Sequence, residues 1–229
     1  MVDFHSHILP GIDDGSRNVE ESVELLKMLS EQGVHTVVAT PHFLAGRESV
    51  DEFLIRRQTA YETLRAQLPA GMPKIVLGAE VKYYSGISRM EGLNKLCAGN
   101  GNFLLLEMPM SQWTEYTIQE LLELSNSRGI TLVLAHIERY MSFQNSNVFD
   151  RLINSGVLMQ VNATFFTSFF TRRRALMMLR KNRIHFLGSD CHRVLTRPPY
   201  IGDAIEIIEK KMGKEFIALM TEYASSVLG

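Results

Sequence analysis

This 229-residue chain has few cysteines, no long apolar run and no excess of charge of either sign. The two cysteines, Cys97 and Cys191, are too few for a disulfide framework or a thiolate zinc cluster. A formal net charge of -1 argues against a surface built to bind nucleic acid, which requires clustered basic residues. No apolar run reaches the roughly 18 residues of a membrane span. Because Asp3 and two histidines stand where a signal peptide would be apolar, these absences predict a cytoplasmic protein.

Short apolar runs recur along the chain and alternate with amphipathic segments. Hydrophobic residues make up 45% of the sequence and charged residues 21%, which is ordinary for a globular protein with a sizeable core. We expect parallel strands at the apolar runs, which occupy about residues 1–4, 35–40, 74–80, 102–107, 131–135, 157–161 and 184–188.

Helical patterns fill the gaps between these runs. Asn18 followed by Glu21 is typical of a helix start, and Gly33 of a helix end. No linker or low-complexity tract separates the elements, so we expect residues 1–229 to form a single domain. The other expected helices cover residues 50–68, 114–127, 149–154, 166–182, 201–212 and 215–228.

Seven strands that alternate with helices predict a parallel sheet with right-handed crossovers. An open doubly wound sheet would gather its site at one switch point, from two or three strand ends. Here six of the seven strand ends carry histidine or carboxylate side chains. That distribution favours a closed α/β barrel, whose strand ends converge on one face.

Five of the seven histidines stand at or just beyond strand ends, together with several carboxylates, whereas His35 and His185 lie at strand starts and are expected to pack there. Imidazole and carboxylate without thiolate suit Mn²⁺, Fe or Zn²⁺. Since one ion takes only about four to six ligands, the set predicts two or three ions. The candidate metal ligands are His5, His7, His42, Glu80, Glu107, His136, Asp190 and His192, with further carboxylates from Asp13 and Asp14 on the turn after His7.

The spacing within two residue pairs strengthens this interpretation. His5 and His7 are two residues apart on a strand, so their side chains point to one face about 7 Å apart and can share a cation. Asp190 and His192 repeat that spacing on the last strand. A carboxylate that ends an apolar strand is costly to bury unless it binds a metal or, as the alternative, pairs with an arginine.

These residues and their flanking motifs resemble the metal-ligand series of the PHP (polymerase and histidinol phosphatase) superfamily. The motifs D-x-H-S-H-I-L-P-G-I-D-D-G, T-P-H, G-A-E, A-H-I-E-R-Y and S-D-C-H followed by R-P-P are similar to those of its capsule and exopolysaccharide operon branch. That branch consists of manganese-dependent protein tyrosine phosphatases that oppose bacterial tyrosine kinases. The resemblance therefore implies a phosphotyrosine protein, the C-terminal tail of such a kinase, as the substrate.

The same resemblance implies a distorted (β/α)7 TIM-like barrel with three ions, Mn²⁺ being the expected metal. Metal-activated hydroxide is then expected to attack the phosphoryl group without a covalent protein intermediate. By the family's pattern, which implies Asp14 as the ligand from the turn after His7, the three sets of ligands are His5, His7, Glu80 and Asp190; Glu80, Glu107 and His136; and Asp14, His42 and His192.

Phosphotyrosine carries about two negative charges, so cationic side chains are expected beside the metals. Arg139 and Arg197 lie on loops that follow ligand-bearing strands, and each guanidinium group can fork onto phosphate oxygens. The resemblance implies the same two residues. The alternative is a structural ion pair with Glu138 or another surface acid.

Cys191 and Arg197 also form a C-x5-R pattern, which is typical of cysteine-dependent tyrosine phosphatases. The intervening residues contain no glycine, although a phosphate-binding loop needs tight backbone turns. We therefore interpret Cys191 as a bystander. The aromatic segment 165–170, which precedes three arginines, is expected to be helix core followed by a solvated basic turn, with stacking on a tyrosine ring as the alternative.

Other functions on the same fold remain alternatives. They are a histidinol-phosphate phosphatase, a nuclease-like PHP module and a non-catalytic metal-binding regulator. The near-neutral charge disfavours the nuclease. Glutamates occupy the middle strand ends at which an amidohydrolase usually has a bridging lysine, which disfavours that class as well.

Overall fold

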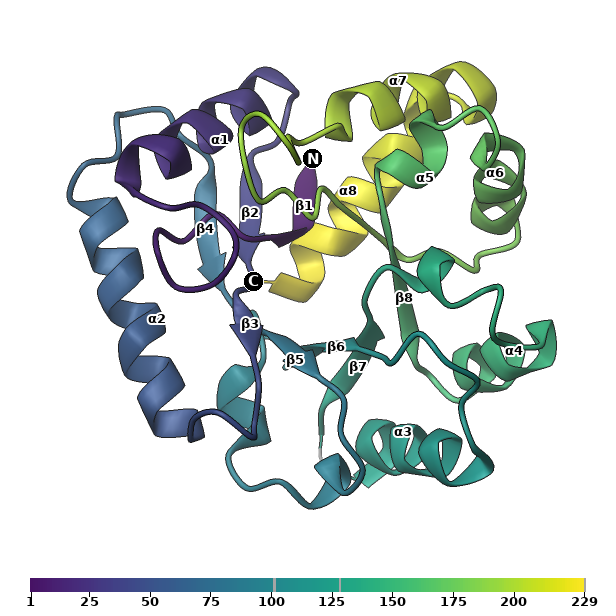
Figure 1. The fold of residues 1–229 in the computed structure, drawn as a ribbon. Helices are drawn as coiled ribbons and strands as arrows, with labels where there is room; N and C mark the ends of the chain where they lie inside the picture. Colours follow the sequence, from purple (N-terminus) through teal and green to yellow (C-terminus); the bar gives the residue numbers. More distant parts are fainter. Residues whose placement is uncertain (101, 128, 229) are drawn as a thin grey trace.

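The computed structural model describes residues 1–100, 102–127 and 129–228. It is an α/β fold in which a curled parallel sheet is surrounded by helices (Figure 1). The strands are β1 (Val2–Ser6), β2 (Thr36–Ala39), β3 (His42–Phe43), β4 (Lys74–Leu77), β5 (Glu80–Lys82), β6 (Phe103–Glu107), β7 (Thr131–Leu134), β8 (Leu158–Asn162) and β9 (Phe186–Gly188). The α-helices are α1 (Val19–Glu31), α2 (Val50–Arg65), α3 (Glu115–Ser127), α4 (Ser146–Asn154), α5 (Thr164–Thr167), α6 (Arg172–Arg180), α7 (Ile201–Met212) and α8 (Lys214–Leu228), and the 3-10 helices are η1 (Ile87–Arg89), η2 (Leu93–Leu96) and η3 (Ile137–Arg139).

The strands pair in two runs, β1-β2-β4 and β3-β5-β6-β7-β8-β9. The strand expected at residues 74–80 is in fact two short strands, and β3 follows the strand expected at 35–40 as an additional one. Pro41, which has no N–H to donate, lies in the first break. Gly78 lies in the second, where a Cβ atom would approach that of Ala98 to 3.0 Å. After the breaks, His42 and Glu80 stand opposite each other in register.

The sheet curls until its first and last strands lie side by side. The Asp190 N–H donates to the His5 carbonyl at 2.8 Å, and the His7 N–H donates to the Cys191 carbonyl at 2.9 Å. Because parallel strands end at the same edge of a sheet, these bonds bring His5 and His7 beside Asp190 and His192.

The amino ends of the strands are closed by apolar packing. Phe4 stacks on Phe186 with 3.9 Å between the ring centroids, and Phe103 meets both rings edge-on. Helix α8 lies against this cluster, since Tyr223 stacks on Phe186 with 5.6 Å between the ring centroids and Leu228 is buried with it. Removing these rings from water stabilises the contact between α8 and the sheet.

Most helices begin and end near the expected residues. Asn18 caps α1 by accepting a 2.9 Å hydrogen bond from the Glu21 N–H, and Gly33 follows that helix with a φ of +80°. Helix α2 ends at Arg65, before the expected limit of residue 68. No helix of the three described ranges has the length and apolar character needed to cross a membrane.

The expected single helix over residues 166–182 is wrong. Two helices, α5 and α6, replace it, and residues 168–171 separate them. The Thr171 hydroxyl donates to the Phe165 carbonyl at 2.7 Å, and the Arg172 guanidinium donates to the Phe166 carbonyl at 3.0 Å. These side chains take the carbonyl groups that a continuous helix would need, which explains the break.

Candidate metal centre

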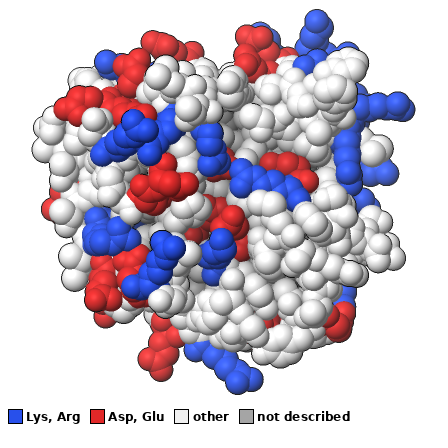
Figure 2. Space-filling model, viewed as in Figure 1, with Lys and Arg blue, Asp and Glu red and all other residues white. Residues whose placement is uncertain are grey.

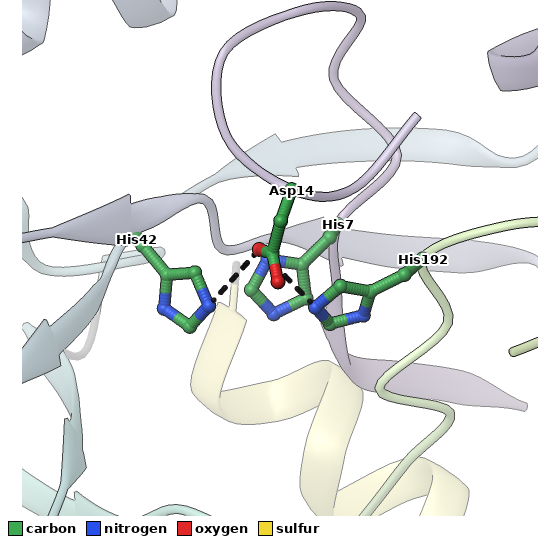
Figure 3. Close-up of side chains that lie close together, drawn as sticks. All are labelled: His7, Asp14, His42 and His192. Atoms are coloured by element: carbon green, nitrogen blue, oxygen red, sulfur yellow. Dashed lines mark ion pairs between the residues drawn. The ribbon is translucent and has the colours of Figure 1, made fainter. Parts of the chain in front are cut away.

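All nine side chains expected to bind metals come together at the carboxyl edge of the sheet. They form four overlapping groups, in each of which one ligand atom from every member lies within 4.8 Å of the others. Figure 3 shows one group, with the Asp14 carboxylate projecting between His42 and His192 and with His7 beside them. The groups are His7, Asp14, His42 and His192; His5, His7 and Asp190; His5, Glu80 and His136; and His42, Glu80 and Glu107.

The imidazole pair at the end of β1 lies at the middle of the cluster. His5 Nε2 and His7 Nε2 face each other at 3.1 Å, and Glu80 Oε2 lies 3.4 and 3.3 Å from them. Asp190 Oδ1 is 3.7 and 3.6 Å from the same two nitrogens. Two ligands about 2.1 Å from a common cation lie about 3.0 Å apart in octahedral and about 3.4 Å apart in tetrahedral geometry. The four atoms therefore have nearly the spacing of a coordination shell.

Glu80 links the groups to one another. Its Oε2 atom is also 3.0 Å from His42 Nδ1, and its Oε1 atom is 2.8 Å from His136 Nε2. Burial alone would raise the pKa of Glu80, but His5 and the hydrogen-bonding imidazoles around it lower that pKa well below its usual value. A buried carboxylate held ionised among imidazoles has the charge that a shared metal ligand needs.

His192 has the properties of a ligand without a partner. Its Nε2 atom is buried, and within the described residues it neither accepts nor donates a hydrogen bond. The nearest carboxylate oxygen, on Asp14, is 3.5 Å away. Burial, together with the charges of His7 and Arg197, lowers the pKa of His192 to about 4, so its imidazole is neutral. A neutral, buried imidazole with an unused lone pair fits a cation, and the donor set as a whole therefore fits a metal cluster.

Asp13, the neighbour of Asp14, orients two histidines through groups other than their Nε2 atoms. Its carboxylate accepts from His7 Nδ1 at 2.8 Å and from the His42 backbone N–H at 3.0 Å. Burial would raise the pKa of Asp13, but the His7 hydrogen bond and charge hold it well below its usual value. A carboxylate that accepts from Nδ1 fixes the ring and leaves Nε2 free for a cation.

Strand β8, whose end carries no expected ligand, supplies two supporting amides. The Gln160 side-chain oxygen accepts from the His136 N–H at 2.6 Å, and the Asn162 side chain donates to Asp190 Oδ2 at 2.8 Å. The Tyr140 hydroxyl lies 3.0 Å from His136 Nδ1. Sequence reasoning missed these three residues, although for Gln160 and Asn162 the amides at the one ligand-free strand end were an available signal.

Both expected arginines reach the cluster at Asp190. Arg139 Nη2 contacts Asp190 Oδ2, and Arg197 Nη2 is 2.7 Å from the same oxygen. Glu138, the alternative partner considered for Arg139, instead accepts from the Asn162 N–H at 3.3 Å, and burial raises its pKa to about 7. The Arg139 and Arg197 side chains are 31% and 42% exposed, so both remain accessible from solvent.

The C-x5-R cysteine and the aromatic segment lie outside the cluster. Cys191 is fully buried in the core, and burial raises the pKa of its thiol, which disfavours a thiolate nucleophile. Phe165 and Phe166 are buried as helix core, as expected. Phe169 and Phe170, in contrast, are 83% and 93% exposed.

A curled parallel sheet with imidazoles and carboxylates at its carboxyl edge, flanked by two arginines, defines an α/β protein with a candidate metal centre. Comparison with known sequences narrows this class. The chain belongs to the family described as capsular polysaccharide synthesis, CpsB/CapC, whose family model matches residues 1–228. The family resemblance stated from the motifs is thereby confirmed.

Named relatives cover the whole chain. It is 33% identical over 240 residues to the tyrosine-protein phosphatase CpsB of Streptococcus agalactiae serotype III, covering 100% of this chain and 98% of that protein. It is 29% identical over 234 residues to the tyrosine-protein phosphatase YwqE of Bacillus subtilis, covering 100% and 91%. A solved structure from work on YwqE from Bacillus subtilis and CpsB from Streptococcus pneumoniae, described as metal-dependent tyrosine phosphatases, matches with a TM-score of 0.84 at 27% identity, covering 100% and 94%.

Proposed function

We propose that the protein is a metal-dependent tyrosine-protein phosphatase that hydrolyses phosphotyrosine on proteins. The observation that carries this proposal is the convergence of nine imidazole and carboxylate side chains beside two accessible guanidinium groups, Arg139 and Arg197. The names of the relatives favour phosphotyrosine over histidinol phosphate, and over a metal-binding role without catalysis.

For the fold we propose one domain, residues 1–229, built as a distorted (β/α)7 barrel of the PHP type. Two features support seven strands: β2 with β3, and β4 with β5, each count as one interrupted strand. The hydrogen bonds between the first strand and the end of the last support closure of the ring. Its carboxyl face is where a barrel presents a catalytic site.

We propose that the cluster holds two or three divalent ions, with Mn²⁺ as the expected metal and Fe or Zn²⁺ as alternatives. When bound, such ions would lower the pKa of a water molecule and offset negative charge on the phosphoryl oxygens. The ligand sets proposed from the family's pattern are His5, His7, Glu80 and Asp190; Glu80, Glu107 and His136; and Asp14, His42 and His192.

The two arginines are proposed to bind and orient the substrate phosphate. Both guanidinium groups already contact Asp190 Oδ2, an anionic oxygen. Their N–H donors are therefore directed toward negative charge and can also bind a phosphoryl oxygen of the substrate. A guanidinium group has five N–H donors and can keep one on the carboxylate while it offers others to phosphate. Cys191 takes no part in this scheme, because its thiol is buried and its pKa is raised.

In the cell, we propose a cytoplasmic enzyme whose substrate is the phosphorylated C-terminal tail of a bacterial tyrosine kinase that regulates capsular or exopolysaccharide synthesis. The family description, capsular polysaccharide synthesis, supports that context. Nucleic acid is not a proposed partner, since the net charge is -1.

The decisive experiment compares metal-free and Mn²⁺-loaded protein on a phosphotyrosine peptide and on histidinol phosphate. We expect chelation to abolish hydrolysis of the peptide, and Mn²⁺ to restore it. Full activity of rigorously metal-free protein would contradict the metal mechanism. Preferential hydrolysis of histidinol phosphate would favour the small-molecule phosphatase, and metal binding without turnover of either substrate would favour the non-catalytic regulator.

A further inference from the structure

The link between α5 and α6 carries two aromatic rings that the candidate site does not use. Phe169 and Phe170 are adjacent in the chain and are 83% and 93% exposed, whereas Phe165 and Phe166 just before them are buried. Single exposed apolar residues are common on protein surfaces, but two neighbouring rings left in water forgo a large gain from burial. Their position therefore points to a partner that covers them.

The chain around these rings has charge of one sign only. Residues 169–183 include six basic residues and no acidic one, although the whole chain has 24 basic and 25 acidic residues. Figure 2 shows basic side chains gathered along the edge of the molecule where Figure 1 places α6. An otherwise acidic protein thus has a local basic surface beside its most exposed aromatic pair.

Three of the six cations are free to bind a partner. Arg172, Arg180 and Arg183 bond within the protein, to backbone carbonyl groups or, in the case of Arg183, to Asp150 at 2.6 Å. In the part of the chain that the structure describes, the exposed cations without a hydrogen bond or ion pair in this stretch are Arg173, Arg174 and Lys181.

Helix α6 presents Arg173 and Arg174 on its outer face, and Lys181 directly follows its last residue. Its inner face packs into the core through Ala175, Leu176, Met178 and Leu179. The outer face carries the arginines and Met177, which is 49% exposed. The helix is therefore amphipathic, with a cationic outer face, and the phenylalanine pair directly precedes it.

We propose that this basic aromatic surface docks the protein on a membrane that contains anionic lipids. Guanidinium and ammonium groups bind lipid phosphates, and aromatic rings enter the boundary between headgroups and acyl chains. The surface consists of Phe169, Phe170, Arg173, Arg174, Met177 and Lys181.

A lipid surface fits these observations better than a protein partner does. A symmetric dimer through this surface would place the cations of two copies against each other, which is unfavourable. An acidic peptide would satisfy the cations, but the pocket beside α6 is lined by Arg174 and Met177 and by neither ring, so a peptide held there would leave Phe169 and Phe170 in water. A fluid lipid interface, in contrast, deforms around projecting rings.

The part of the docking surface that contains Phe169 and Phe170 follows the carboxyl end of β8, the end of the sheet that carries the candidate site. Helix α5 begins two residues after Asn162, whose side chain contacts Asp190, and the phenylalanine pair follows α5 directly. Docking would therefore hold the site close to the membrane and favour phosphotyrosines near it. Only this consequence rests on the proposed phosphatase function, because membrane binding is measured without catalysis.

The test is co-sedimentation of the full chain with vesicles of phosphatidylcholine alone or mixed with phosphatidylglycerol. We expect binding to the mixed vesicles, little binding to the neutral ones, and release as salt concentration rises. Arg173→Glu/Arg174→Glu should weaken binding at least about tenfold, since each basic residue near an anionic membrane contributes about 1 kcal/mol. Phe169→Ser/Phe170→Ser should weaken it at least about tenfold as well, because the rings no longer enter the lipid interface. Both variants should keep wild-type hydrolysis of a small aryl phosphate.

Matched controls carry the same changes elsewhere on the surface. Ile55→Ser/Leu219→Ser removes two apolar side chains that are 68% and 64% exposed, and Arg65→Glu/Arg89→Glu reverses two exposed charges; both should bind vesicles like the wild type. Equal binding to neutral vesicles, or unchanged binding of the phenylalanine and arginine variants, would overturn the proposal. Absence of vesicle binding would overturn it as well. In that case, loss of affinity of the variants for an acidic phosphotyrosine peptide would indicate a peptide partner, and loss of a dimer seen by light scattering would indicate a second copy of the chain.

Discussion

Histidines at the two ends of the same sheet have opposite environments. At the amino ends, His35 is exposed, and His185 is half-buried with its Nδ1 atom accepting from the Met159 N–H at 3.0 Å. At the carboxyl ends, the histidines lie in one cluster with four carboxylates: His5, His7, His42, His136 and His192. A histidine next to a strand therefore indicates a metal site only where strand ends converge and carboxylates accompany it.

The pKa values of buried His7 and half-buried His185 show how different these ends are. Burial lowers the pKa of His185 to about 4, because no carboxylate opposes the loss of hydration. Burial also acts on His7, yet hydrogen bonds and charges from Asp13 and Glu80 raise its pKa to about 10. The carboxylates beside His7 thus favour positive charge at that position, whereas nothing of the kind acts on His185.

The largest expected difference between the two ends is in catalysis. His136→Ala removes a proposed ligand, so we expect turnover of an aryl phosphate to fall by at least about 10³-fold. His185→Asn, at the amino end, keeps a hydrogen-bond acceptor for Met159 and should leave turnover within a few-fold of wild type. Steady-state kinetics at saturating Mn²⁺ measure both. Similar losses in the two variants would break the distinction between the ends.

Within the carboxyl end, the arginines are expected to act on substrate and not on the metals. Arg139→Ala or Arg197→Ala should lower kcat by about 10²- to 10³-fold, because a charge-assisted contact to the phosphoryl group is lost. Metal content, measured by mass spectrometry on the same samples, should remain that of the wild type. Loss of metal would instead show that the arginines mainly hold Asp190 in place.

A smaller effect is expected when a residue behind the ligands is changed. Asp13→Asn keeps the size of the side chain but weakens its hold on His7 Nδ1, so metal affinity should fall by about 10- to 100-fold. Titration calorimetry with Mn²⁺ measures this affinity directly. The exposed control Asp51→Asn, on α2, should bind Mn²⁺ like the wild type. If Asp13→Asn bound Mn²⁺ as tightly as the wild type, Asp13 would not be a positioning residue for His7.

The amino end is expected to respond to pH through His185. Its folded-state pKa of about 4 lies below the ordinary value of 6.5, so the unfolded chain binds more protons between these values. The stability that depends on neutral His185 is thus fully present above pH 6.5 and is lost as pH falls toward 4, by at most about 3 kcal/mol. Chemical denaturation at pH 7.5 and 5 should show a smaller loss for His185→Asn than for the wild type. Equal losses would assign the pH dependence to other groups.

The smallest effect is expected at the cysteine between two ligands. Cys191→Ser should stay within a few-fold of wild-type activity, because water and not a thiolate is the proposed nucleophile. Phosphate-release kinetics on purified protein measure it, with chelator sensitivity as the second readout. A loss of several orders of magnitude, or a trapped phosphocysteine, would overturn the mechanism.

Much of the site could be predicted from sequence because its signals are local. Strand ends are visible as the limits of apolar runs, and parallel strands bring their carboxyl ends to one edge. That reasoning singled out eight of the side chains, the family resemblance added Asp14, and the structure places the ligand atoms of all nine in overlapping groups within 4.8 Å. It missed Gln160, Asn162 and Tyr140, since neutral hydrogen-bonding side chains have no fixed spacing pattern.

The sequence by itself determined the order of strands and helices, the helix caps and the chemical character of the site, because each depends on neighbouring residues. Only the tertiary structure decided how β2 and β4 are interrupted, where the segment after β8 breaks into α5 and α6, and that Phe169 and Phe170 project into solvent. It also decided that Asp190 gathers Arg139, Arg197 and Asn162 around one oxygen. Arg139 and Asn162 lie 51 and 28 residues from Asp190 in the chain, so no local pattern links them, and only packing of the whole sheet brings them within hydrogen-bonding distance.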